Sequence, residues 1–195
     1  KEILKEAKKF GYAESNPKSD INGNDVGSKI RILSSLCFHT LISKNNILID
    51  GIYNIENKDI INAKKLGYRI KLLGITEIIN NNIFERVHPS LVRINSYIAN
   101  INGVFNATII SGKPVGQSVM QGEGAGPGPT SSALISDLCS ILKGEINYPF
   151  GVPSSERRKI IKPYQYAHFR YVKIEGIRTI LDYVRKIRCD SISVD

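Results

Sequence analysis

The turn sequence Asn80-Asn81-Asn82 constrains the fold of this chain more than any other local feature. It lies between two runs rich in apolar and β-branched residues, 68–79 and 83–87. Two such runs joined by a short polar turn predict an antiparallel hairpin. A second hairpin is predicted from 105–111 and 115–121, across Gly112-Lys113-Pro114. Because hairpin strands are antiparallel neighbours, the two pairs favour a largely antiparallel sheet.

Predicted helices lie on both sides of this block of strands. Apolar residues at helical spacing predict helices at 1–13, 25–41, 57–66 and 130–142, the last capped by Thr130. A loop is predicted at 14–24 and a short strand at 47–49. Helices that bracket adjacent strands are typical of an α+β fold. We therefore expect a mixed, largely antiparallel sheet with helices packed on one face.

The net charge of +9 does not by itself indicate a nucleic-acid partner. Lys and Arg are spread along the chain, and their tightest cluster, Arg157-Arg158-Lys159, lies in a predicted connector. No apolar run approaches the roughly 20 residues of a membrane helix. We expect neither a nucleic-acid nor a membrane partner.

The cysteines predict neither disulfides nor a metal site. Cys37, Cys139 and Cys189 are odd in number and far apart, with no CxxC pair and no histidine at ligand spacing. Buried free thiols in a reducing cytoplasm account for them, so we expect a cytoplasmic protein without a metal.

Acidic residues cluster around one basic residue near the start of the second predicted helix. Asp25 and Lys29 stand four apart, which places them on one helix face, with Asp20 and Glu14 shortly before them. Such spacing is common in surface ion pairs, and spacing alone favours that interpretation over a catalytic one. The loop 122–128 also has two interpretations: its glycines let backbone approach a flat ring or a phosphate, or they form a simple turn into the next helix.

The local strings favour the catalytic interpretation of the Asp25–Lys29 pair. Gly11-Tyr12-Ala13-Glu14, followed by Asp20, Gly23, Asp25 and Lys29 in a D-x-x-G-x-D-x-x-x-K pattern, resembles the signature of homoserine dehydrogenases. Further landmarks follow in the same order: Leu66-Gly67-Tyr68, Lys71-Leu72-Leu73-Gly74, Val87-His88-Pro89, Asn106-Ala107, and Gly124-Ala125-Gly126 with Pro129-Thr130 and Asp137-Leu138. The chain departs from the family pattern at Asn16, Gly27 and Ser28, and none of these is a predicted site residue.

The resemblance implies an NADP- or NAD-dependent oxidoreductase that interconverts L-homoserine and L-aspartate 4-semialdehyde, in threonine, isoleucine and methionine biosynthesis. It assigns proton transfer to Lys29 and homoserine binding to Glu14 and Asp25, and it places Gly11 and Gly126 against the cofactor. From their positions in the sequence we add Asp20 as a substrate-site residue that orients Lys29, and Gly124 as a further cofactor-binding residue. It also implies a homodimer formed through the sheet.

The expected domain organisation is that of a fragment. Residues 1–145 are predicted to form the catalytic, substrate-binding and dimerisation domain, 146–166 a connector, and 167–195 a truncated domain that resembles an ACT domain. No G-x-G-x-x-G follows a strand, so the Rossmann domain is expected to be absent and the fragment inactive alone. The alternative hypothesis is a non-catalytic amino-acid-binding regulatory module, in which the ACT-like tail is the working part.

Overall fold

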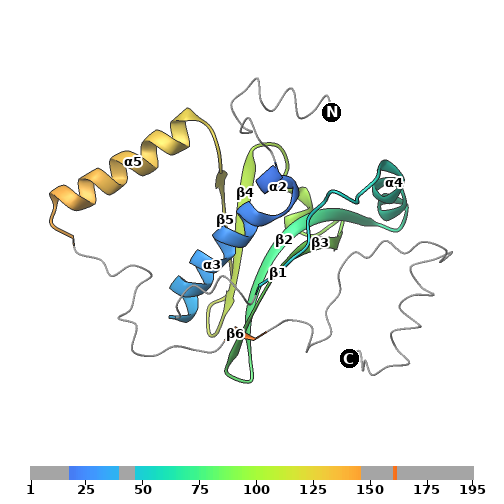
Figure 1. Ribbon diagram of the computed structural model, residues 1–195, viewed down its shortest axis with the longest axis horizontal. Helices are drawn as coiled ribbons and strands as arrows, with labels where there is room; N and C mark the ends of the chain where they lie inside the picture. Colours follow the sequence, from blue (N-terminus) through green and yellow to red (C-terminus); the bar gives the residue numbers. More distant parts are fainter. Residues whose placement is uncertain (1–17, 40–46, 146–159, 162–195) are drawn as a thin grey trace.

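The computed structural model describes residues 18–39, 47–145 and 160–161. These residues form two separate sheets with helices around them (Figure 1). The elements in chain order are α2 (Lys18–Ile21), α3 (Asn24–Phe38), β1 (Leu48–Ile49), α4 (Asn57–Lys65), β2 (Tyr68–Ile79), β3 (Asn82–Arg93), the 3-10 helix η1 (Ile98–Asn100), β4 (Phe105–Gly112), β5 (Gly116–Glu123), α5 (Pro127–Leu142) and β6 (Ile160–Ile161).

The larger sheet is built on the long β2–β3 hairpin. The two strands are antiparallel, with Tyr68 opposite Arg93 at one end and Ile79 opposite Asn82 at the other. Asn80 and Asn81 make the turn with φ values of 49° and 62°, a left-handed conformation that asparagine tolerates better than most residues. The hairpin expected here is confirmed. On the other side of β3 lie β1 and β6, both parallel to it, so this sheet is mixed.

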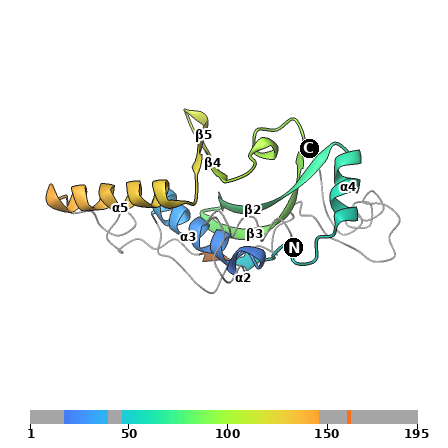
Figure 2. The same ribbon diagram turned by 90° about the horizontal axis from the view of Figure 1, so that it is seen from above.

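Helix α3 lies against one face of this sheet (Figure 2). Strand alternation directs Ile83, Val87 and the Gly74 position towards the helix, and Ile83 and Val87 are fully buried. Ile30 of α3 packs directly on Gly74. We call α2, α3, β1, β2 and β3 the packed body, because the buried residues of the described chain concentrate there.

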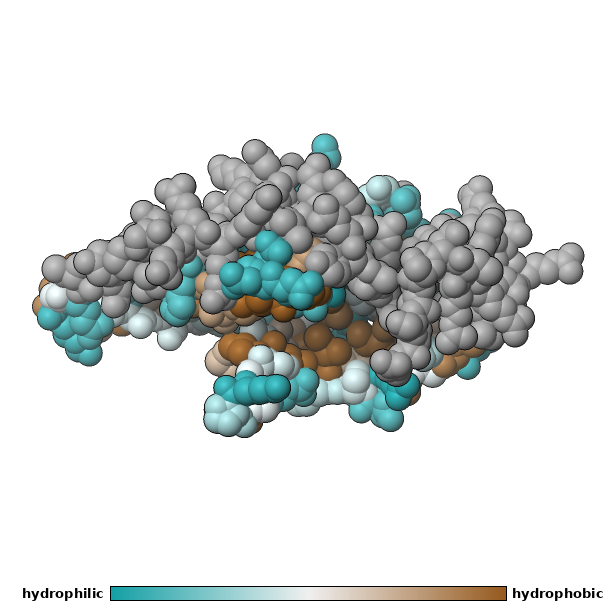
Figure 3. Space-filling model, turned by 90° about the horizontal axis from the view of Figure 1, so that it is seen from below, coloured by the Kyte–Doolittle hydropathy of each residue, from teal (hydrophilic) through white to brown (hydrophobic). Residues whose placement is uncertain are grey.

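The smaller sheet and the last helix project from this body. Strands β4 and β5 form the second expected hairpin, from Phe105 opposite Glu123 to Gly112 opposite Gly116. Every residue of β5 is exposed, and none of the residues of α5 is buried. Figure 1 shows α5 extending away from the sheets, and Figure 3 shows apolar surface lying open between hydrophilic patches on the face seen from below. We call β4, β5 and α5 the arm.

Several predicted boundaries were wrong. Helix α3 ends at Phe38 rather than Leu41, and β3 runs on to Arg93 rather than ending at Val87. The predicted loop 14–24 contains α2, a four-residue helix that ends where Gly23 adopts φ 79° and its N–H donates to the Asp20 carbonyl. Thr130 is not a cap, because α5 begins at Pro127 and the Thr130 N–H already donates to the Gly126 carbonyl. Proline suits the first helical position, where its missing N–H costs nothing.

Exposure of the cysteines was also predicted wrongly. Cys37 and Cys139 are free thiols, as expected, but both are exposed. Cys37 lies near the outer end of α3 and Cys139 on the projecting α5, so neither helix face has a protein layer among the described residues to bury it. Within the described ranges, no helix is long and apolar enough to cross a membrane.

Candidate functional site

Asp25 and Lys29 occupy the first two turns of α3 and form an ion pair. The Lys29 Nζ lies 2.8 Å from the Asp25 Oδ2, at the i,i+4 spacing expected from the sequence. The two side chains are 56% and 40% exposed. A half-exposed ammonium remains accessible to a small molecule, and its carboxylate neighbour can also accept a hydrogen bond from a ligand.

The other two acids predicted for this cluster are not seen in contact with Lys29. Asp20 is exposed on α2, and its backbone carbonyl accepts the bond that ends that helix. Its carboxylate makes no ion pair among those found in the described part of the chain. Glu14 and Gly11 lie outside the described residues. The structure therefore brings Asp25 to Lys29, while the roles of Glu14 and Asp20 stay predictions.

Three glycines let the elements around Lys29 approach one another closely. A Cβ at Gly74 would stand 2.9 Å from Val26 Cγ1, and one at Gly27 would stand 2.7 Å from Ile49 Cδ1. A Cβ at Gly51 would lie 2.3 Å from the Ile21 carbonyl oxygen, where the Ile52 N–H also donates to that oxygen. A larger residue at Gly51 would meet the backbone of Ile21 and Asn22, and one at Gly74 would meet Val26 and Ile30, so these two glycines set how closely α2 and α3 approach the sheet. At Gly27 the nearest atom is the terminal methyl of Ile49, which can move aside.

The glycine loop connects the end of β5 to the start of α5 (Figure 1). Gly126 has φ 115° and ψ 164°, a conformation essentially restricted to glycine. A Cβ at Gly124 would lie 1.7 Å from the Asn106 Nδ2, so the Asn106 side chain packs directly on the Gly124 backbone.

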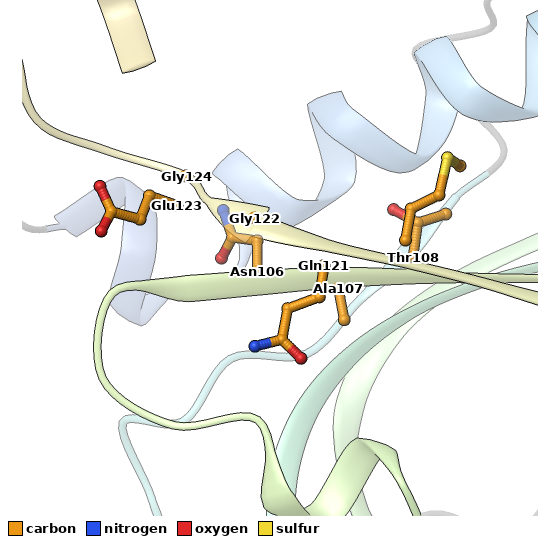
Figure 4. A pocket seen from close by; sticks show the side chains of 8 residues that line it. Asn106, Ala107, Thr108, Gln121, Gly122, Glu123 and Gly124 are labelled. Carbon is orange, nitrogen blue, oxygen red and sulfur yellow. The ribbon is translucent and has the colours of Figure 1, made fainter. Parts of the chain in front are cut away.

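A shallow pocket of about 340 Å³ lies at the base of the β4–β5 hairpin (Figure 4). Its lining comprises Asn106, Ala107, Thr108, Met120, Gln121, Gly122, Glu123 and Gly124. The Tyr97 hydroxyl donates to the Gln121 Oε1 at 2.8 Å, which ties this lining to η1. The lining offers neutral amides, one hydroxyl and one carboxylate, and it contains no lysine or arginine. Phosphates prefer cationic partners, so this set of groups suits a neutral or cationic ring better than a phosphate.

Two buried or contacting side chains, Asn106 and Glu85, were not predicted as functional from the sequence. Asn106 belonged to a recognised string, but only its contact with Gly124 reveals what the side chain does. Glu85 is a glutamate on β3 that is 1% exposed, and an isolated sequence gives no signal for a buried charge in a strand. Burial raises the pKa of the Glu85 carboxyl, partly offset by a hydrogen bond from Ser34 and by the charge of Arg31.

Comparisons with known proteins agree with one another. A family profile described as homoserine dehydrogenase matches residues 1–139. The homoserine dehydrogenase of Neisseria gonorrhoeae is 43% identical over 142 residues, which are 73% of this chain and 33% of that protein. That of Helicobacter pylori is 40% identical over 157 residues, 80% of this chain and 37% of that protein. This chain thus spans about a third of the length of these curated relatives.

Solved structures give the same result. The homoserine dehydrogenase of Thiobacillus denitrificans superposes with a TM-score of 0.70 at 33% identity, covering 97% of this chain and 46% of that one. The structure of S. aureus homoserine dehydrogenase at pH 6.5 superposes with a TM-score of 0.67 at 35% identity, covering 76% of this chain and 38% of that one. The described fold therefore occurs inside longer proteins of this kind.

Proposed function

This chain belongs to the homoserine dehydrogenase family, and we propose that it carries the substrate-binding and proton-transfer part of an enzyme that interconverts L-homoserine and L-aspartate 4-semialdehyde with NADP or NAD. The observation that supports this most directly is the half-exposed Asp25–Lys29 ion pair on α3. In this proposal the Rossmann domain lies outside the chain, and the chain alone is inactive.

Lys29 has the chemistry that the reaction needs. Reduction of the aldehyde builds negative charge on its oxygen, and an ammonium within hydrogen-bond reach stabilises that charge and delivers a proton. In the opposite direction the neutral amine accepts the hydroxyl proton of homoserine. Asp25, whose carboxylate already holds one ammonium at 2.8 Å, is suited to bind the ammonium of homoserine, and we assign the same role to Glu14. Asp20 remains a candidate for orienting Lys29.

The nucleotide side of the proposal rests on the glycine loop. A bound nicotinamide cofactor supplies the hydride donor or acceptor. We assign contacts with it to Gly11, Gly124 and Gly126. The conformation of Gly126 and the amide-rich, cation-free lining of the neighbouring pocket support the ring end of the cofactor there rather than its phosphates. Glycine is also required at position 124 for packing, because the Asn106 side chain lies against its backbone.

Homodimerisation through the sheet is part of the same proposal. A two-stranded sheet is at best marginally stable alone, and β5 exposes Val119 and Met120. A second copy is the partner that we propose for this surface. A cytoplasmic location also belongs to the proposal, supported by the free thiols of Cys37 and Cys139.

The decisive experiment replaces Lys29 in the full-length enzyme. Lys29→Ala is expected to lower kcat by a factor on the order of hundreds or more while the protein stays folded, because the proton-transfer group is lost. The matched control is Lys58→Ala, which removes another exposed lysine that pairs with an acid, Glu56, at 3.0 Å. Steady-state kinetics should show the control unchanged.

Equal turnover in Lys29→Ala and Lys58→Ala would contradict the proposal. It would favour the alternative, a non-catalytic amino-acid-binding regulatory module. The predicted ACT-like segment on which that alternative depends, 167–195, lies outside the described residues.

A further inference from the structure

The second half of α3 is attached to the sheet by polar rather than apolar contacts. The buried residues of α3 are Gly27, Ile30, Ser34 and Ser35, so Ile30 is its one buried large apolar residue, with Val26 and Leu33 only partly buried. Ile32 and Leu36, by contrast, are 43% and 47% exposed. An apolar surface of this size would not by itself fix the rotation of the helix or its position along its axis, because hydrophobic contact is non-directional.

Directional contacts are present at the same place. The Ser34 and Thr76 hydroxyls lie 3.0 Å apart, and Thr76 is directly opposite Glu85 in the β2–β3 register. The Ser34 hydroxyl also hydrogen-bonds the Glu85 carboxyl. Since Ser34 has one proton, its donation to Glu85 requires Thr76 to donate to Ser34. The result is a chain of hydrogen bonds from β2 through α3 to β3.

Glu85 is the charged end of this chain, and its burial costs stability. Its side chain is 1% exposed, and its Oε2 has no hydrogen-bond partner among the described residues. The opposite charge nearby is Arg31, which lies on α3 two residues after Lys29. A carboxyl whose pKa is raised by burial destabilises the fold in full above the raised pKa, and the cost disappears only once the pH falls below the ordinary pKa of the unfolded chain. A neutral side chain would be the more stable choice, so stability does not account for this residue.

We propose that Glu85 is a positioning residue for Lys29: through Ser34 and Arg31 it fixes the rotation and axial position of α3, and so the place of the Lys29 amine. This inference rests on the proposed role of Lys29 in proton transfer. Proton transfer tolerates little misplacement of the acid/base group, and supporting contacts of this kind are what hold such a group in place. Glu85 itself touches neither substrate nor cofactor in this account.

The test uses Glu85→Gln in the full-length enzyme. Glutamine keeps the size of the side chain and an oxygen for Ser34 but removes the charge opposite Arg31. The matched control is Glu77→Gln, because Glu77 follows Thr76 on β2 and therefore lies on the opposite face of the sheet, where it pairs with Arg86. Both variants are compared for kcat, for the KM of the nucleotide, for the solvent deuterium isotope effect on kcat, and for stability in urea.

The expected result separates positioning from simple support of the fold. In Glu85→Gln, kcat falls by about ten-fold or more, the solvent isotope effect rises because proton transfer becomes slower, and the nucleotide KM stays within about two-fold of the parent. The free energy of unfolding does not fall. Loss of folded protein would lower kcat without changing the isotope effect.

Two outcomes would overturn the inference: a Glu85→Gln enzyme with the kcat and isotope effect of Glu77→Gln, or a loss of kcat that parallels a loss of stability. If Glu85→Gln does not fold, Ser34→Ala carries the same test, since it removes the link between α3 and Glu85 at little steric cost. Lys29→Ala, measured in parallel, reports on the proposed function. If Lys29→Ala also leaves kcat unchanged, the proposed role of Lys29 is wrong. If Lys29→Ala lowers kcat but Glu85→Gln does not, only the proposed role of Glu85 is wrong.

Discussion

The packed body and the arm use their side chains in opposite ways. In the body, polar and charged residues such as Ser34, Glu85 and His88 are buried between α3 and the sheet or within it. In the arm, large apolar residues such as Leu138 and Met120 are exposed. The body therefore fixes the geometry of Asp25 and Lys29 with its own contacts. The arm, which carries the glycine loop at its base, exposes the apolar surface that we propose a second copy covers.

The largest difference expected between the two regions is the loss of stability when a large apolar side chain is truncated to alanine. Phe84 is 1% exposed, and Phe84→Ala should lower the free energy of unfolding of the 195-residue chain by about 3–5 kcal/mol through lost burial and a cavity. Leu138 is 47% exposed on α5, and Leu138→Ala should change the free energy of unfolding by no more than about 0.5 kcal/mol. Urea denaturation measures both. Similar losses for the two variants would show that the arm is packed as tightly as the body.

A second difference is expected in assembly. Val119→Glu places a charge on the exposed sheet of the arm, and in the full-length enzyme it should raise the dimer dissociation constant by about a hundred-fold, because the charge would be buried without a partner. Ile60→Glu is the control, since Ile60 is a similarly exposed apolar residue on α4. Light scattering over a concentration series measures the masses. A dimer that survives Val119→Glu unchanged would remove this surface from the interface.

The smallest expected difference concerns glycines. Gly74→Ala should cost about 1–2 kcal/mol, since the new Cβ would meet Val26 at 2.9 Å and Ile30 at 3.1 Å. Gly122→Ala in the arm should be neutral or slightly stabilising, because a Cβ there meets nothing within 4 Å. Thermal unfolding compares the two. A neutral Gly74→Ala would mean that α3 is free to move off the sheet, and would weaken the case that its position is fixed.

Sequence reasoning succeeded where the signal was local. The asparagine turn predicted the β2–β3 hairpin, and the i,i+4 spacing predicted the Asp25–Lys29 contact. It missed α2, because four residues show no periodicity and this helix is held by contacts with Gly51 and Ile52. The partners of such elements come from elsewhere in the chain.

Burial escaped prediction for the same reason. From the sequence, Glu85 is an ordinary polar residue of a strand, and only the packing of α3 on the sheet buries it. The parallel pairing of β6 with β3 falls inside the predicted connector, and nothing local to Ile160-Ile161 reveals its partner. Both features depend on contacts between segments far apart in the sequence, which hydrophobic pattern and turn chemistry do not encode.

The most direct test of the account is a crystal structure of the full-length enzyme with L-homoserine and a nicotinamide cofactor bound. We expect the Lys29 Nζ within hydrogen-bond distance of the substrate hydroxyl, the Asp25 carboxylate on the substrate ammonium, and Gly126 against the nicotinamide end of the cofactor. A Lys29 amine that stays paired with Asp25 alone and faces solvent, while the substrate binds elsewhere, would contradict it.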